Sequence, residues 1–173
     1  MNIPTGRKWR FVLVAVPLLF VSLWIAQAHG DDDIGAQFLG MWKLVSWEQR
    51  VADGTTRQAA NSVGYIVYTD VGRMCYVGMN PNRPKWKSLT PTEPEALTGI
   101  VGLGAYCAAV ELHAGEGYVV HHLDIERVPN NVGIARKRWF RFDSANRLTL
   151  RIDTPELIPP VVESTLTWER ITK

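Results

Sequence analysis

Two stretches of the sequence decide the fold: GMWKLVSWEQR at residues 40–50 and VVESTLTWER at residues 161–170. Each alternates apolar and polar side chains, which is the period-2 pattern of a β-strand with one buried face. One stretch opens the strand-like part of the chain and the other closes it. Because a barrel closes when its first and last strands pair, these two runs predict a closed antiparallel barrel.

Short runs between these two stretches complete the pattern. Glycine, proline, aspartate and asparagine separate neighbouring runs, and Asp70-Val71-Gly72 marks the clearest hairpin. Eight strands with short sequential connections predict an all-β fold, an eight-stranded antiparallel up-and-down barrel. Such a barrel is either filled by side chains or holds one small ligand. The expected strands cover residues 38–50, 63–69, 73–79, 105–113, 118–127, 132–143, 147–153 and 161–171.

One short helix is expected over residues 93–104, between the third and fourth strands. Thr92 and Glu95 form a capping-box pattern, and Pro94 is tolerated in the first turn. Its glycines make the helix weak, so packing must hold it. Because a proline-rich loop precedes it, the helix either covers one mouth of the barrel or only bridges two strands.

The first 28 residues have the features of a secretory signal peptide. Three basic residues precede an apolar stretch over residues 11–25, and Ala26-Gln27-Ala28 matches a signal peptidase site. The apolar stretch is shorter than the roughly 20 residues of a membrane-spanning helix. We therefore expect cleavage after Ala28 and a periplasmic or secreted location. Retention of the segment as an N-terminal anchor is the alternative.

Cleavage would change the charge of the protein. The leader holds three of the 19 basic residues and none of the 17 acidic ones, which leaves 16 basic against 17 acidic and a net charge of −1. This balance gives no electrostatic reason to expect nucleic acid or an anionic membrane as a partner. We expect a flexible lead-in over residues 29–37, one barrel domain over residues 38–173 and no stable membrane span after cleavage. The sequence indicates no oligomeric state.

Cys75 and Cys107 are the only cysteines in the chain. In an oxidising compartment they either form a disulfide or remain two inert buried thiols. A bridge would close a loop of about 33 residues, worth roughly 3–4 kcal/mol in the chain-entropy model. Two isolated cysteines do not form a metal or redox motif, and the common nucleotide-binding and hydrolase motifs are absent from the sequence. We therefore expect no metal and no cofactor.

Several segments in this order resemble one family. They are GMWKLVSWE (40–48), GYIVYTDVGRM (64–74), NPNRP (80–84), VVHHLDI (119–125), PNNVG (129–133), RWFRF (138–142), NRLTL (146–150) and LTWERI (166–171). The chain resembles the lipocalin-like domain of bacterial and fungal proteins of mostly unassigned function. The resemblance covers residues 37–172. It implies a lipocalin-type barrel and no well-established activity.

The alternation also gives the candidate ligand-binding residues. They are Trp42, Tyr76, His121, Arg138 and Trp168. Trp42 is expected at the barrel floor, because the G-x-W pattern is similar to that of true lipocalins, where this tryptophan lies beneath a basic side chain. Arg170 is expected over its indole as a structural closure, with Arg138 as the competing residue.

His121 and His122 are adjacent in a strand, so their side chains point to opposite faces. His121 shares its phase with Val119 and Leu123 and is expected inside, while His122 is expected outside. His121 is either a hydrogen-bonded core histidine or a functional group. As a functional group it would be a polar anchor for a ligand or a general base.

Arg138 shares its phase with Phe140 and Phe142, which predicts that it enters the barrel. A buried arginine needs an anion, either Glu48 or Glu111 within the chain or the carboxylate of a ligand.

These residues favour an exported lipocalin-like protein that binds a small, largely apolar molecule, an acid being one option. One alternative is a cofactor-free isomerase or cyclase that uses His121, a cavity tyrosine or Glu48. The other is a structural barrel without a ligand. The volume of the cavity separates the structural barrel from the other two functions. A pH-dependent turnover separates the enzyme from the binding protein.

Overall fold

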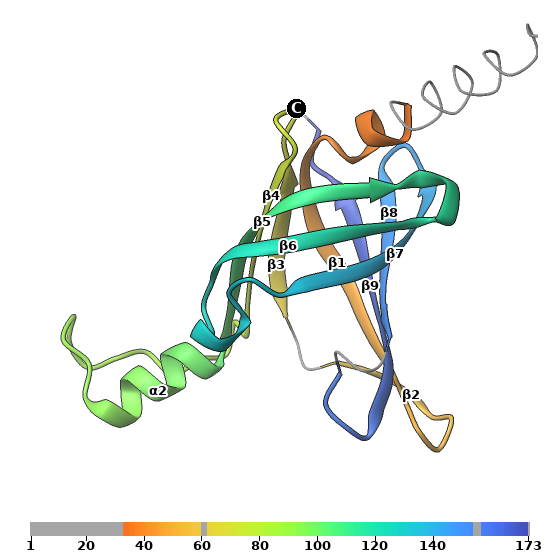
Figure 1. Cartoon of the computed structure of the whole chain (residues 1–173). Coiled ribbons are helices and arrows are strands. Elements are labelled where there is room, and N and C mark those ends of the chain that lie inside the picture. The colour runs from red at the N-terminus through yellow and green to blue at the C-terminus, as the bar shows by residue number, and fades with distance from the viewer. Residues whose placement is uncertain (1–32, 60–61, 154–156, 173) are drawn as a thin grey trace, which may run out of the picture.

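The computed structural model describes residues 33–59, 62–153 and 157–172 (Figure 1), so the expected signal peptide lies outside the described residues. The described residues form a nine-stranded antiparallel sheet, of which eight strands close into an up-and-down barrel. The strands are β1 (Gly40–Val51), β2 (Thr56–Gln58), β3 (Val63–Tyr68), β4 (Arg73–Met79), β5 (Leu103–His113), β6 (Tyr118–Glu126), β7 (Ala135–Ser144), β8 (Arg147–Asp153) and β9 (Val161–Arg170).

The barrel closes between the two stretches that predicted it. β1 pairs with β9 along most of its length, and Trp42 lies opposite Arg170 in the register. The first residues of β1 also pair with β3, which completes the ring. The predicted fold class is therefore confirmed. The three-residue strand β2 was not predicted; it pairs with the far end of β1.

The helix α2 covers Glu93–Val101 and ends three residues earlier than predicted. It was expected between the third and fourth strands but lies between β4 and β5, because β2 adds one strand before it. The Glu95 carboxylate accepts a hydrogen bond from the Thr92 backbone N–H at 2.9 Å, as the capping box requires. The helix buries none of its residues and projects away from the barrel (Figure 1).

Residues 33–38 are helical, and β1 starts at Gly40 rather than at residue 38. A flexible lead-in was expected over residues 29–37, but residues 33–37 belong to this helical turn. The turn ends in Phe38, which is 4% exposed and belongs to the core. The chain is therefore fastened to the barrel before its first strand begins.

A β-bulge in β1 changes which side chains face inward. The register with β9 shifts between Leu44 and Ser46. Trp42 and Leu44 point inward before the shift, and Trp47 lies against the core after it. Simple alternation counted from Trp42 places Trp47 on the outer face, because such counting takes no account of an extra residue in one strand.

Cys75 and Cys107 lie opposite each other in neighbouring strands β4 and β5 and form a disulfide. Of the two possibilities open from the sequence, the structure contains the bridge. Cys75 lies between the inward residues Met74 and Tyr76, and Cys107 lies between the inward residues Tyr106 and Ala108. The disulfide therefore lies on the outer wall of the barrel.

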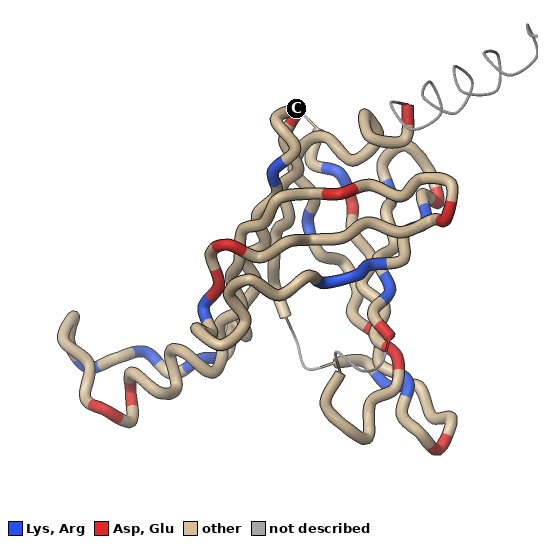
Figure 2. The backbone as a smooth tube through the Cα atoms, in the orientation of Figure 1, with Lys and Arg blue, Asp and Glu red and all other residues tan. Residues whose placement is uncertain are grey.

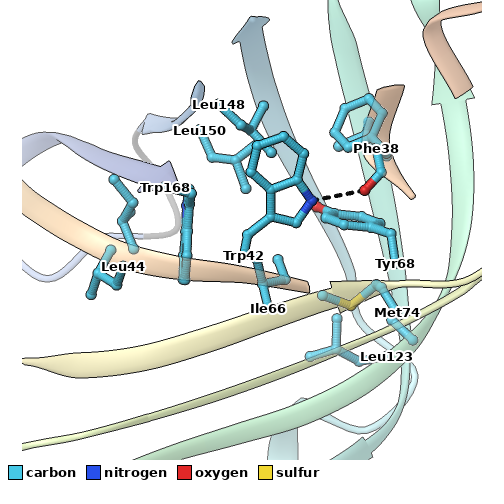
Figure 3. Close-up of a cluster of buried hydrophobic side chains, with 13 residues drawn as sticks. Phe38, Trp42, Leu44, Ile66, Tyr68, Met74, Leu123, Leu148, Leu150 and Trp168 are labelled. Carbon is cyan, nitrogen blue, oxygen red and sulfur yellow. Dashed lines mark hydrogen bonds between the residues drawn. The ribbon is translucent and has the colours of Figure 1, made fainter. Parts of the chain in front are cut away.

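The core fills one part of the barrel interior (Figure 3). Large side chains from strands on all sides meet there, and the indoles of Trp42 and Trp168 are 0% and 1% exposed. Other fully buried members include Ile66, Met74, Val119 and Leu148. This packing fills the barrel interior at the level of Trp42.

Candidate functional site

The closed end of the barrel is built around Trp42. Its indole N–H donates a hydrogen bond to the Phe38 carbonyl oxygen at 2.8 Å (Figure 3). The Arg170 guanidinium lies 4.0 Å from the centre of the indole ring and also donates hydrogen bonds to the carbonyls of Gln37, Leu39 and Ala145. Arg170 therefore closes this end, as predicted, and Arg138 does not. The contact is structural, because it consumes the donors of the guanidinium.

A cavity of about 180 Å³ lies farther along the barrel. Its wall combines aromatic and aliphatic side chains with two guanidinium groups. The lining residues are Trp47, Ile66, Tyr76, Tyr106, Arg136, Arg138, Leu150, Ile152, Leu166 and Trp168. They come from β1, β3, β4, β5, β7, β8 and β9, so the cavity is a product of the closed barrel. An apolar wall with a few convergent polar groups is typical of a small-molecule site.

Tyr76 lies over a row of glycines on the inner wall. Gly64, Gly78 and Gly104 are opposite one another in the register of β3, β4 and β5. A Cβ atom at Gly78 would lie 2.0 Å from the Tyr76 hydroxyl, and one at Gly104 would lie 3.2 Å from its ring. The ring thus occupies space that three absent side chains leave. Burial raises the pKa of Tyr76 to about 12, so its hydroxyl stays protonated at neutral pH.

His121 is a fully buried hydrogen-bonding centre behind the cavity wall. Its Nε2 lies 3.0 Å from the Tyr68 hydroxyl and its Nδ1 lies 3.3 Å from the Tyr106 hydroxyl. Burial, together with the positive charges of Arg138 and Arg136, lowers its pKa to about 3. The imidazole is therefore neutral at physiological pH, with one nitrogen donating and the other accepting. This geometry fits a core histidine that positions Tyr106. A base with so low a pKa is poorly suited to general base catalysis.

Acidification is expected to destabilise the protein through His121. The unfolded histidine gains a proton as the pH falls through 6.5, whereas the folded one stays neutral down to about pH 3. The unfolded state then binds more protons, so the free energy of unfolding decreases as the pH falls through this window. Urea unfolding at pH 7.5, 6 and 5 measures the slope. His121→Gln should flatten it above pH 5, where few carboxylates titrate. If the free energy of unfolding of His121→Gln depends on pH as steeply as that of the wild type, His121 is not the group responsible.

Two arginines of β7 reach the cavity. The Arg138 side chain is 6% exposed and its Nη1 donates a hydrogen bond to the Lys137 carbonyl oxygen at 2.7 Å. Arg136 lies 3.4 Å from the buried carboxylate of Glu126. Figure 2 shows this basic stretch of β7 as continuous blue, and Lys137 between the two arginines is exposed. Positive charge therefore lies at an otherwise apolar wall.

The carboxylates expected to pair with Arg138 are engaged elsewhere. Glu48 accepts a hydrogen bond from the exposed Gln58 side chain at 3.0 Å. Glu111 lies on the outer face, within 2.7 Å of His113 and 2.6 Å of His122. The internal pairing of Arg138 with either residue was therefore wrong, because both carboxylates lie outside the barrel. The prediction that His122 faces outward is confirmed.

Trp168 contributes a polar group to the cavity. Its side chain is 1% exposed, and its indole N–H has no hydrogen-bond partner among the residues that the structure describes. A buried donor without a partner lowers the stability of the folded state by about 1–3 kcal/mol. A hydrogen-bond acceptor that enters the cavity would remove this loss. By contrast, the Trp47 indole donates to the Ser164 hydroxyl at 2.6 Å.

The structure brings three of the five candidate residues together at the cavity: Tyr76, Arg138 and Trp168. Trp42 and His121 are buried in the core and do not line it. Sequence reasoning did not select Trp47, Tyr106 or Arg136. Arg136 shares its phase with Arg138, which could have identified it. Trp47 was hidden by the bulge, and the apolar first part of β5 gave no alternation for Tyr106.

Within the described residues, no three histidine, cysteine, aspartate or glutamate side chains are grouped so that they could hold a metal ion. The site is therefore built from aromatic rings, two guanidinium groups and one indole N–H. Such groups can contact an apolar body and donate hydrogen bonds to an anionic group.

Eight antiparallel strands closed around an internal cavity define the class of small up-and-down barrels. A family model described as a lipocalin-like domain matches residues 39–171, and the chain belongs to this family. The predicted resemblance is thereby confirmed.

Two designed proteins are among the similar solved structures. A redesigned beta barrel is 11% identical with a TM-score of 0.41, covering 80% of this chain and 95% of that one. A de novo designed fluorescence-activating beta barrel is 10% identical with a TM-score of 0.40, covering 80% and 98%. No curated protein matches the chain.

Proposed function

We propose that this lipocalin-like protein binds a small, largely apolar acid in the barrel cavity. The observation that carries the proposal is the combination, in one lining, of aromatic walls, the buried Arg138 and the unpartnered indole N–H of Trp168. An apolar ligand body would contact Trp47, Tyr76 and Tyr106. Its carboxylate would accept hydrogen bonds from Arg138, whose planar guanidinium suits a carboxylate.

The cavity volume limits the ligand to about one ring or a short chain. A dry apolar cavity of about 150 Å³ holds benzene in an engineered protein. The cavity of about 180 Å³ is thus sized for a molecule such as benzoate or hexanoate. A longer fatty acid would have to extend beyond the cavity. The volume also supports a binding role over a structural barrel with no ligand.

The enzyme alternative has less support. Its proposed base, His121, is neutral, buried and held by two tyrosines. Glu48 is on the outer side, and the pKa of Tyr76 is raised to about 12 by burial. Binding is therefore the function that these residues support best.

Binding can be tested by following the fluorescence of the protein during titration, because two tryptophans line the cavity. Benzoate and its neutral counterpart toluene form one matched pair, and hexanoate and hexanol form a second. Saturable binding with a preference for the acid in each pair is expected at pH 7.5. Equal affinity for the acid and the neutral compound would contradict the proposal that the ligand is an acid. An absence of saturable binding of every compound would reject the site.

We also propose that the protein is exported. The basic, apolar and small-residue regions of residues 1–28 support this, as does the disulfide, which persists in oxidising compartments. Among the described residues, no helix has the length and apolar character needed to traverse a bilayer. N-terminal sequencing of protein from the periplasm or medium should begin at His29. A membrane-associated chain that retains Met1 would establish the anchor instead.

A further inference from the structure

The outer wall of the barrel has an apolar side and a polar side. Apolar side chains cover the outer wall over the first half of β1 and over β3 and β4, and they continue across the small residues of β5 to Ile125 of β6. We define the apolar face by Met41, Val63, Tyr65, Val77, Met79 and Ile125, which are 38–64% exposed. The outer sides of β7, β8 and β9 instead carry ion pairs, such as Arg147 with Glu169 and Arg151 with Glu163.

The strand register makes the apolar face continuous. Tyr65 lies opposite Val77, and Val63 lies opposite Met79, while the half-buried disulfide fills the wall beside them. Charge appears only at its borders, at Lys43 on β1 and at the Arg73–Asp124 ion pair. An apolar centre with a charged rim is the composition of a protein interface.

The helix α2 extends this surface. It joins β5 at the end of the apolar face where Met79 pairs with Leu103, and it projects from the barrel (Figure 1). Its side chains of Leu97, Ile100 and Val101 are 65%, 50% and 71% exposed. A helix of nine residues is marginal in water without packing, because helix nucleation is costly. Trp86 is the large side chain beside it and is itself 44% exposed, so within the described residues the apolar side of α2 is only partly covered.

We propose that the apolar face and α2 form the interface between two copies of this chain. Four strands about 4.8 Å apart with three outward rows about 7 Å apart cover roughly 400 Å². A helix of this length adds roughly 140 Å². Two copies together then bury roughly 1,000 Å², the area at which a specific interface becomes credible.

A second copy fits this surface better than a membrane does. The wall is a convex barrel, so two walls alone would touch over only part of the face. The projecting α2 of each copy can cover the part of the other copy's apolar face that the two walls leave uncovered. In a two-fold arrangement both helices then contact the same surface of the partner. Basic and acidic side chains are mixed on this surface, since Lys85 and Lys87 precede Glu93 and Glu95 of α2, whereas an anionic membrane favours a cluster of basic residues.

The test is the mass of the protein in solution, measured by sedimentation velocity over a concentration series. The protein is expressed from its full sequence and studied in the form to which the cell processes it. Wild type is expected to be a dimer. Val77→Lys places two ammonium groups in a two-fold interface. The dissociation constant of the dimer should therefore rise at least about tenfold. Leu97→Lys on α2 should have the same effect.

Val71→Lys is the matched control, because Val71 is 75% exposed in the β3–β4 turn and lies outside the apolar face. It should remain dimeric. Circular dichroism of each variant verifies the fold, and Leu97→Lys provides a test even if Val77→Lys misfolds. A monomeric wild type, or dimers that persist in both variants, would overturn the proposal. So would a monomer that floats with phosphatidylcholine vesicles and loses this binding in Val77→Lys, which would assign the face to a membrane.

Discussion

Replacing Trp42 by alanine should lower the free energy of unfolding by about 3–5 kcal/mol, the range for truncation of a large buried aromatic side chain. The indole is 0% exposed and lies between Arg170 on one side and core aromatics such as Phe142 on another. The substitution would also leave the Phe38 carbonyl without its donor. Urea unfolding monitored by circular dichroism measures the loss.

Trp86→Ala is the matched control for this measurement. Trp86 is 44% exposed and lies outside the barrel, so its truncation should cost about 1 kcal/mol or less. If Trp42→Ala and Trp86→Ala unfold at the same urea concentration, Trp42 does not hold the closed end of the barrel.

Replacing Arg138 by methionine should weaken the binding of benzoate or hexanoate by about 2–5 kcal/mol, the range for loss of one partner of a buried charged pair. Methionine keeps much of the apolar stem and removes the guanidinium. The affinity for toluene should be nearly unchanged, because the aromatic wall remains. Calorimetric titration of both proteins with the matched compounds measures the difference.

Arg141→Met controls for the loss of a positive charge, since Arg141 lies on the outer face of the same strand beside Asp143 at 2.7 Å. It should bind benzoate like the wild type. Arg138→Lys keeps the charge but not the planar pair of donors, and should give an intermediate affinity. If Arg138→Met binds benzoate as tightly as the wild type, the carboxylate does not lie at Arg138. Equal losses for benzoate and toluene would show that the substitution damages the cavity itself.

The ends of the barrel were predictable from the sequence because both end strands alternate clearly. Trp42 and Arg170 lie in regular parts of β1 and β9, where period-2 counting gives the correct face. His121 and Arg138 were placed inside for the same reason, since β6 and β7 pair without a shift around them. Local pattern and tertiary structure agree at these positions.

The rest of the site depends on features that alternation cannot express. The bulge at Leu44 and Ser46 turns Trp47 toward the interior. The first part of β5, residues 103–110, has no polar residue to mark one of its faces, so its inward tyrosine, Tyr106, does not stand out. The partner of an arginine is also a matter of three-dimensional distance, which is why Glu48 and Glu111 were wrong choices.

The glycine row under Tyr76 has a consequence for how this barrel can diversify. Gly64, Gly78 and Gly104 leave a shallow bed in the wall, and a single ring fills it. A smaller residue at position 76 would deepen the chamber, and a side chain at Gly78 or Gly104 would displace the ring. Chamber volume is thus set by a few side chains on β4 and β5. A single substitution at Tyr76, Gly78 or Gly104 is therefore expected to change the size of the chamber.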